Sequence, residues 1–210
     1  MTRELTEESK TALPLNKKPI TPKNEQQFSK YLSYILRHHP EDIGLELLQD
    51  GWVDTHKLIE AINNSSNNKY FVALYQLIHI VNTDNKQRYS FKASKDDEYA
   101  FIRANQGHSI KNLTMDFKEV TPPKYLYHGT SIDSYNKIVK SGEIKPMSRQ
   151  MVHLSKDFET ATNVGKRHGK PVILTIDTEK AMQDDKKFYI SENGVYLVDS
   201  LSTKYIKSIQ

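Results

Sequence analysis

Apolar residues in the first half of the chain recur at three- and four-residue steps, the spacing of one helix face. They predict a helix that begins at the possible N-cap Asn24 and ends at Pro40. A second helix is predicted to follow Asp54, a good N-cap residue, and to close in the loop Asn63–Asn68, and a third covers Tyr70–Val81. The positions expected to face inward are Phe28, Leu32, Ile35 and Leu36 of the first helix and Leu58, Ile59 and Ile62 of the second.

An alternating pattern follows the third helix. In the run RYSFK, Tyr89 and Phe91 alternate with polar residues, and a charged turn SKDDE then leads into YAFIR. This pattern is typical of a β-hairpin. Three helices followed by a hairpin form the order of a winged helix-turn-helix, which often binds nucleic acids. We expect such a lobe over residues 24–120, with Trp52 and Tyr89 in its core rather than stacked on bases.

The character of the chain changes at Thr121-Pro122-Pro123, because adjacent prolines stop regular structure, and a boundary between two lobes is predicted there. Short apolar strands then alternate with two helices that end at Gly142 and Gly165. We expect a β-rich lobe over residues 121–210, which makes the whole chain α+β. The predicted strands are Tyr125–Tyr127, Met151–Leu154, Val172–Ile176, Phe188–Ile190, Val195–Val198 and Tyr205–Ser208, and the predicted helices are Ile132–Lys140 and Asp157–Val164.

Composition limits the class of protein. The 210 residues allow one large domain or two small lobes, and the 37% hydrophobic share is enough for a core. Residues 1–23 mix charges with three prolines without a sustained period, and we expect a flexible leader there. The chain has no cysteine and no apolar run near the roughly 20 residues that span a bilayer. A soluble, cytoplasmic protein is therefore expected. We also expect a monomer, although composition does not decide the oligomeric state.

Basic residues and histidines gather in a few short segments, although the net charge is only +4. Arginine matches phosphate oxygens with two parallel hydrogen bonds, and histidine moves a proton near neutral pH. A single cluster also fits a solvated helix end, but several in one chain favour a phosphate site. The segments are LRHHP (36–40), IRANQGHS (102–109), YHGTS (127–131), VHLS (152–155) and VGKRHGKP (164–171).

Other chemistries are weakly supported. His38 and His39 are adjacent, and no two histidines are four residues apart, so the spacing does not favour a metal site. The sequence has no G-x-S-x-G elbow for a serine hydrolase. The glycine-rich loops G-x-x-x-x-G-K-[ST] and G-x-G-x-x-G are absent as well, so a nucleotide would bind by another scheme.

The basic segments, read with their neighbours, resemble the successive signature blocks of the RNA 2′-phosphotransferases. The matching blocks occur in the order of that family and cover about Tyr31 to Tyr205. They are LSYILRHHPEDIGLELLQDGWV, IRANQGHS, YLYHGTS, KPMSRQMVHLS, VGKRHGKPV and SENGVYLVD. The sequence departs from the family pattern at Gly142, at Met151 before VHLS and in NGVYLV.

The resemblance implies a two-lobed enzyme with an N-terminal winged-helix RNA lobe and a C-terminal NAD-binding lobe of the ADP-ribosyltransferase type. Such enzymes transfer an internal RNA 2′-phosphate, left at a tRNA splice junction, to NAD. The phosphate first attacks C1″ of the nicotinamide ribose and expels nicotinamide. The ribose O2″ then attacks the phosphate, which releases RNA with a 2′-hydroxyl and ADP-ribose 1″,2″-cyclic phosphate. No metal is implied.

The resemblance also assigns roles to residues. The family's catalytic Arg-His-Arg-Arg set falls on Arg37, His38, Arg103 and Arg167. Three guanidiniums and an imidazole suit a phosphate that carries nearly two negative charges. His38 is the candidate proton carrier of the second step, with pure phosphate binding as the alternative.

The NAD-binding positions implied by the family lie in the second half of the chain. Val195 stands where related toxins place a catalytic glutamate, which would repel an incoming phosphate. For Gly129 a tight turn, and for Ser155 a helix cap, are alternatives to direct contact. The implied positions are His128, Gly129, Thr130, His153, Ser155 and Val195.

The remaining choices concern RNA contact and the outcome of the reaction. Gln106 and His108 are expected to steady the RNA backbone or ribose, or else to cap the exit of the hairpin. An enzyme that stops after the first step would ADP-ribosylate terminal RNA or DNA phosphates. A decayed transferase would bind RNA without turnover, which the intact arginine and histidine set argues against.

Overall fold

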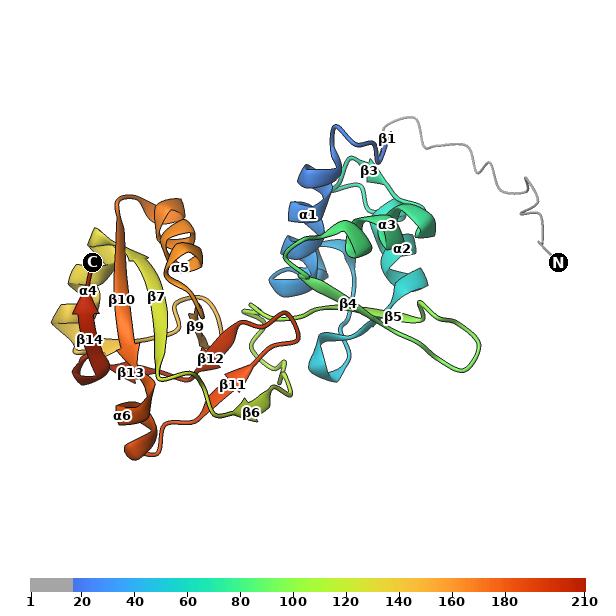
Figure 1. The fold of residues 1–210 in the computed structure, drawn as a ribbon. Coiled ribbons are helices and arrows are strands. Elements are labelled where there is room, and N and C mark those ends of the chain that lie inside the picture. The colour runs from blue at the N-terminus through green and yellow to red at the C-terminus, as the bar shows by residue number, and fades with distance from the viewer. Residues whose placement is uncertain (1–16) are drawn as a thin grey trace.

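The computed structural model describes residues 17–210, and its first part packs three helices against a small sheet (Figure 1). The sheet has the order β2-β5-β4, and β4 and β5 pair antiparallel as the hairpin predicted from sequence. Short 3-10 turns at Pro40–Ile43 and Gln49–Gly51 connect the elements. The bounds are α1 Glu25–Arg37, β2 Val53–Asp54, α2 Thr55–Asn64, α3 Leu74–Thr83, β4 Tyr89–Lys92 and β5 Phe101–Ala104.

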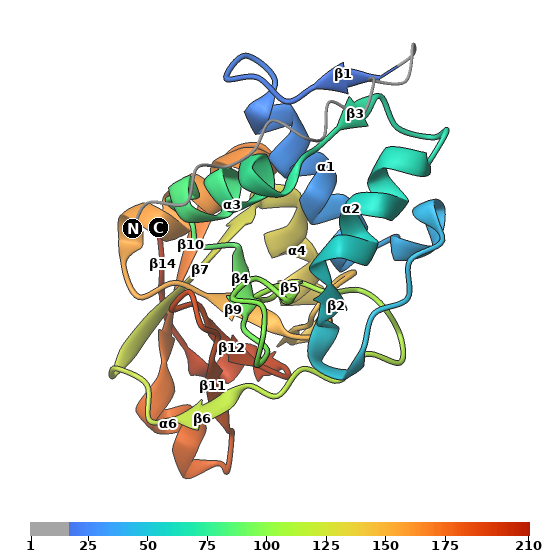
Figure 2. The same cartoon turned by 90° about the vertical axis from the view of Figure 1, so that its right-hand side faces the viewer.

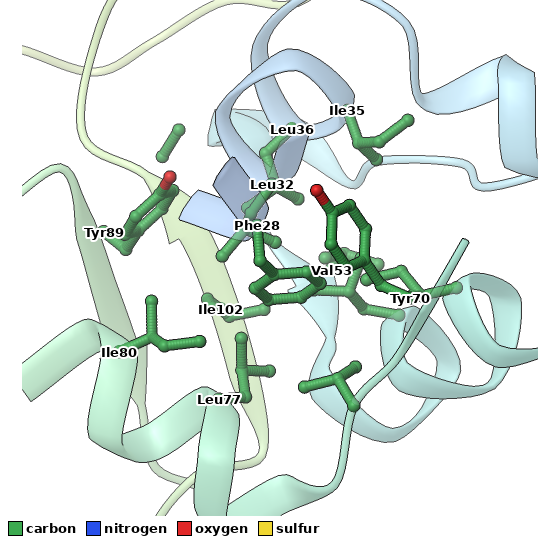
Figure 3. Packing of buried hydrophobic residues seen from close by; sticks show 14 of the residues in the cluster. Phe28, Leu32, Ile35, Leu36, Val53, Tyr70, Leu77, Ile80, Tyr89 and Ile102 are labelled. Atoms are coloured by element: carbon green, nitrogen blue, oxygen red, sulfur yellow. The ribbon is translucent and has the colours of Figure 1, made fainter. Parts of the chain in front are cut away.

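The helix faces predicted from periodicity are confirmed. All four inward positions of α1 are buried (Figure 3). Leu58 and Ile62 of α2 are buried as well, and Ile59 packs partly buried against the same cluster. Asp54 caps α2 by accepting a hydrogen bond from the backbone N–H of Lys57 at 2.9 Å. Tyr89 is core and donates through its hydroxyl to the carbonyl of Ser29.

Two details of the first helices differ from expectation. Asn24 makes no side-chain cap on α1, because its Oδ1 accepts from the N–H of Thr21 and its Nδ2 donates to the carbonyl of Pro19. The third helix begins only at Leu74. Tyr70–Phe71 instead form a short strand, β3, whose aromatic side chains fit a strand as well as a helix face.

The end of the expected leader is ordered against this core. Lys18–Pro19 form β1, which pairs in parallel with β3, and Ile20 is buried in the core cluster. The Lys17 ammonium donates to the carbonyl of Ile62 at 3.0 Å. Strand pairing of Lys18–Pro19 and burial of Ile20 thus give part of the expected leader a defined place against the core. Residues 1–16 lie outside the described part.

The second part contains a separate hydrophobic cluster between small sheets and three short helices. The predicted strands are present, with β7 and β10 longer than expected. Their bounds are β7 Tyr125–Ser131, α4 Ile132–Ser141, β8 Glu143–Ile144, β9 Val152–Leu154, α5 Phe158–Gly165, β10 Pro171–Asp177, α6 Thr178–Gln183, β11 Phe188–Ile190, β12 Tyr196–Val198, β13 Leu201–Ser202 and β14 Ile206–Ile209. Further 3-10 turns span Lys166–His168 and Thr203–Tyr205. The molecule as described is thus a mixed α/β protein.

Two sheets organise this part. β10 lies between β14 and β7, and α5 packs against β7 and β10. The other sheet has the order β6-β11-β12-β9, visible in Figure 2. Its edge strand β6 (Lys118–Val120) precedes Pro122-Pro123, so the chain joins the second part three residues before the predicted proline boundary. No helix in residues 17–210 is long and apolar enough to cross a membrane.

Candidate active site

The last turn of α1 places Arg37 and His38 next to the segment that follows β5. The backbone N–H of Ser109 donates to the carbonyl of Arg37 at 3.0 Å, and Ser109 Oγ lies 2.9 Å from His38 Nδ1. Burial, Arg37 and Arg149 lower the pKa of His38 below its usual value. The imidazole is therefore neutral at pH 7 and able to take up a proton.

Arg103 projects from β5 and is held on several sides. Its Cζ lies 4.5 Å from the centre of the Trp52 ring, and its Nη1 donates to the carbonyl of Asp50 at 3.3 Å. Trp52 is thus a partly exposed platform for Arg103 rather than the core residue expected from sequence. From the second part of the molecule, the carboxylate of Glu192 pairs with Arg103 Nη2 and also accepts from Ser90 Oγ at 2.6 Å.

Several guanidinium N–H groups at this point are buried without a partner in the described residues. They are Nε and Nη2 of Arg37 and Nε of Arg103. Each buried donor left unpaired costs about 1–3 kcal/mol, more when it is charged. Arg37 remains protonated although burial lowers its pKa. The unpaired donors form a site that favours an anion.

His108 lies inside the same group, only 2% exposed, with neither ring nitrogen hydrogen-bonded. Burial, followed by the charges of Arg37, His38 and Arg103, lowers its pKa to about 3, so the ring is neutral. A Cβ on Gly51 would lie 3.0 Å from His108 Nε2, which shows how closely this loop covers the ring. Gln106 likewise has a buried Oε1 without a partner. Contact of either residue with RNA stays a prediction.

The two parts of the molecule meet at Gly107. A Cβ there would lie 3.6 Å from Arg37 Nη1 and 3.8 Å from His153 Cε1, so both side chains border the same point. Two further bonds close the junction: Gln150 N–H donates to the carbonyl of His108 at 3.2 Å, and Asn193 Nδ2 donates to that of Lys86 at 3.1 Å. The turn between β11 and β12 reaches toward β4 in Figure 1.

His128 of β7 and His153 of β9 form the opposite side of this junction. His128 donates from Nδ1 to the carbonyl of His153 at 3.1 Å, and burial lowers its pKa. The neutral ring therefore leaves Nε2 free as an acceptor. His153 stands between Val152 and Leu154, both buried in the second core, and Arg149 Nη1 lies 2.9 Å from its Nδ1. Sequence reasoning missed Arg149.

Gly129 and Thr130 are placed by the packing of α5. A Cβ on Gly129 would lie 1.8 Å from the carbonyl oxygen of Ala161, so glycine is required for close approach of the helix and not for a tight turn. Gly165, expected to stop the helix, has helical angles and lies against the carbonyl of Thr130. Thr130 is buried, at 6% exposure.

Ser155 and Val195 have backbone roles in this structure. Ser155 exchanges two backbone hydrogen bonds with Tyr127, and the helix cap expected of it is supplied by Asp157, whose Oδ1 accepts from Thr160 N–H at 2.7 Å. Val195 closes the turn before β12 through its carbonyl, which accepts from Ser191 N–H at 3.0 Å. The same turn presents Glu192, a carboxylate that the sequence analysis did not single out.

Arg167 follows α5 in the 3-10 turn and is exposed. Its charge contributes to lowering the pKa of Arg149 and of Lys86, which places it on the cationic side of the junction. Charges are shared in the same way by the other residues of the junction. Arg37 and Arg149 lower the pKa of His38, and both also lower the pKa of His153. The structure thus gathers the cationic residues at one junction, with Arg167 at its edge.

The described residues contain one group with the spacing of metal ligands, formed by His39, Glu41 and Asp42. All three are exposed. His39 Nδ1 already lies 3.1 Å from Glu41 Oε1, and the Tyr34 hydroxyl donates to Asp42 at 2.7 Å. His39, Glu41 and Asp42 thus already have hydrogen-bond partners, from each other and from Tyr34.

The described residues thus combine a mixed α/β fold with buried, unpaired guanidinium donors close to neutral histidines, an arrangement that favours an anion such as phosphate. The family model described as RNA 2′-phosphotransferase, Tpt1/KptA family, matches residues 23–200. The chain therefore belongs to the RNA 2′-phosphotransferase family, and the resemblance inferred from the sequence blocks is confirmed.

Curated relatives agree with this assignment. A probable RNA 2′-phosphotransferase of Fusobacterium nucleatum is 49% identical over 185 residues, which cover 88% of this chain and 98% of that protein. Proteins of the same description from Acaryochloris marina and Nostoc punctiforme are 43% and 44% identical, and each alignment covers 87% of this chain and 96% of the relative.

Proposed function

We propose that the protein removes an internal RNA 2′-phosphate, as left at tRNA splice junctions, by transferring it to NAD. The observation that carries this proposal is the set of buried guanidinium donors of Arg37 and Arg103 that no group within residues 17–210 satisfies. A phosphate monoester offers three oxygens and close to two negative charges, which match such donors. Family membership favours RNA as the source of that phosphate.

The two lobes have different tasks in this proposal. The three helices and the β4–β5 hairpin act as a winged-helix lobe that binds RNA, and the second part acts as an ADP-ribosyltransferase-like lobe that binds NAD. Arg37 and His38 come from the first lobe, whereas His128, His153 and Arg167 come from the second. Both substrates would then react at the junction, where Arg37 and His153 border Gly107.

The fit of NAD depends on this chain's own polar groups. His128 Nε2 is left as an acceptor by the Nδ1 bond to the His153 carbonyl, and a ribose hydroxyl is a suitable donor for it. NAD supplies an electrophilic ribose carbon with nicotinamide as its leaving group. Val195 stands where related toxins have a catalytic glutamate. Without that carboxylate beside the ribose carbon, an anionic nucleophile is not repelled.

The chemistry requires mostly positioning and charge stabilisation. In the first step an RNA 2′-phosphate oxygen bonds to C1″ as nicotinamide departs with the bonding pair, and no general base is needed because the oxygen is already anionic. In the second step the ribose O2″ bonds to phosphorus and the RNA 2′-oxygen leaves. The guanidiniums of Arg37, Arg103 and Arg167 would stabilise the charge on the phosphoryl oxygens.

His38 is assigned the proton of the second step. Its depressed pKa keeps it unprotonated at pH 7, so it can accept the proton from O2″ and return it to the leaving 2′-oxygen. Its bond to Ser109 fixes the ring at the end of α1. Proton balance is then maintained within the site.

The test is an analysis of products from a 2′-phosphorylated oligonucleotide incubated with NAD. Mass spectrometry should find nicotinamide, dephosphorylated RNA and ADP-ribose 1″,2″-cyclic phosphate. Accumulation of the ADP-ribosylated oligonucleotide alone would mean that the reaction stops after the first step. Binding of the oligonucleotide without any product would contradict the enzymatic assignment.

The variant Arg103→Ala tests the role of the unpaired guanidinium in the same assay. It should abolish phosphate removal while the melting temperature stays near that of the wild type, because Arg103 is bonded at the junction and not packed in either core. A loss of stability as large as that of a core variant would instead assign Arg103 a structural role.

A further inference from the structure

Arg149 is the arginine at the junction whose guanidinium contacts a histidine ring, because its Nη1 lies 2.9 Å from Nδ1 of His153. The groups close enough to affect its pKa or to be affected by it are cationic or neutral, namely Arg167, Arg37, His38 and His153. Placing a guanidinium among like charges is unfavourable unless it binds an acceptor. The acceptor that the structure provides is Nδ1 of His153, 2.9 Å from Arg149 Nη1.

This contact fixes where the proton of His153 resides. A guanidinium has only donors, so His153 Nδ1 must accept and carries no proton. Burial, with Arg149 and Arg37 adding to it, lowers the pKa of His153 to about 3. A neutral imidazole holds one proton, which is therefore on Nε2.

The neighbouring His128 has the opposite arrangement. It donates from Nδ1 to the backbone carbonyl of His153, so its Nε2 is an acceptor. In both rings the atom without a hydrogen bond to the described part of the chain is Nε2, but its role differs: Nε2 of His128 accepts, and Nε2–H of His153 donates. A pair with one acceptor and one donor is complementary to a sugar diol, in which one hydroxyl donates and the other accepts.

We propose that Arg149 is a positioning residue that holds His153 in the tautomer protonated on Nε2, so that His153 and His128 together bind a ribose diol. The inference rests on the proposed function, because it takes that diol to belong to the nicotinamide ribose of NAD. Arg149 acts on the sugar through His153 and is not itself assigned a bond to the reacting atoms.

The first test reads the tautomer in the ligand-free protein. In a ¹⁵N-labelled sample the His153 ring should show an unprotonated Nδ1 and a protonated Nε2. In Arg149→Met the two tautomers should mix, and the pKa of His153 should rise while burial keeps it below 6.5. A wild-type ring protonated on Nδ1, or an unchanged tautomer in Arg149→Met, would overturn the proposal.

The second test measures NAD binding and its rescue. Arg149→Met should weaken NAD binding about tenfold, the effect of one lost hydrogen bond, and Arg149→Lys, which keeps a donor and the charge, should recover part of it. Lys140→Met is the matched control, because Lys140 is an exposed cation on α4. Unchanged NAD affinity in Arg149→Met would refute the role in ribose binding.

The two tests separate this inference from the proposed function. The tautomer of His153 is measured without NAD, so it reports on Arg149 even if the protein forms no cyclic phosphate from RNA and NAD. Conversely, product formation by the wild type together with an Nδ1-protonated His153 would leave the proposed function standing and remove the role of Arg149.

Discussion

Gly129 illustrates how one residue can be required by packing although its sequence context points to a ligand. It lies in β7 opposite Ile173 of β10, beneath the helix α5. The atoms that a Cβ would meet are the carbonyl oxygen and carbon of Ala161, at 1.8 and 2.7 Å, and both are backbone. A helix backbone cannot yield as a flexible side chain does, so even a methyl group displaces α5.

Gly129→Ala is therefore expected to destabilise the protein by about 3 kcal/mol or more through overpacking. Gly142→Ala is the control. Gly142 has open space around its Cβ position and a φ of 72°. The substitution should therefore lower the free energy of unfolding by only about 1–2 kcal/mol, for the left-handed backbone. Urea unfolding measures both free energies. Equal losses for the two variants would show that α5 does not press on Gly129.

His153 and His108 show what sequence motifs reveal about single side chains and what they omit. The motifs VHLS and IRANQGHS single out both residues, but the neutral state of each ring depends on burial and on arginines that the fold brings close, among them the distant Arg37. Arg149 was missed although it lies in the block KPMSRQMVHLS, because the block was interpreted through its histidine and the arginine shows no periodicity of its own. Its partner is defined only once the segment before β9 is folded.

Helices and local caps were the part of the fold that the sequence predicted best. The 3.6-residue period places buried residues on α1 and α2 because each helix presents one face to a core. Asp54 was predicted correctly as a cap because its side-chain oxygen accepts from a backbone N–H only three residues away, that of Lys57. The cap predicted at Asn24 is wrong, since the side chain of Asn24 bonds to Thr21 and Pro19 in a preceding turn.

Pairings between distant segments could not be predicted in the same way. β1 pairs with β3 across about fifty residues, and β6 joins β11 although a double proline follows it. Neither pairing leaves a local signal beyond a few residues of extended chain. Helix α5 does end at Gly165, as predicted, but the residue has helical angles, and its need for glycine arises from close packing against Thr130.

The cap of α5 matters for the site because this helix leads directly into the turn that carries Arg167. Asp157→Ala should lower the free energy of unfolding by about 1 kcal/mol at pH 7, and Asp157→Asn, which keeps an acceptor, should lose less. Hydrogen bonds from Thr160 lower the pKa of Asp157. The stabilisation by its charge is thus present above the unfolded pKa and is lost as the pH falls through the folded one.

Urea titrations at several pH values check this expectation. The advantage of wild type over Asp157→Asn should be constant near neutrality and shrink below about pH 4. An advantage that grows as the pH falls would contradict the sign of the pKa shift. Equal stability of wild type and Asp157→Ala at pH 7 would exclude the cap altogether.

The two lobes are joined by a charge interaction at the position where substrate is expected to bind. Glu192 lies in the turn between β11 and β12 and contacts Arg103 and Ser90 from the opposite lobe. Arg103 is 11% exposed at its side chain and Glu192 49%, so solvent screens the pair in part. A bound phosphate dianion would meet this carboxylate beside the guanidinium it requires, and like charges repel.

Glu192→Gln is accordingly expected to lower the KM for 2′-phosphorylated RNA, by about twofold to fivefold for a partly exposed charge pair. The amide oxygen can still accept from Ser90, so the turn should keep its place. The KM for NAD should stay unchanged, and added salt should reduce the difference between variant and wild type. Glu179→Gln is the control, because it also removes one negative charge, but from an exposed carboxylate paired with Lys124. It shows how much of the effect comes only from a more positive protein that attracts RNA. A rise in the RNA KM of Glu192→Gln would mean that the carboxylate orients Arg103 for substrate instead of competing with it.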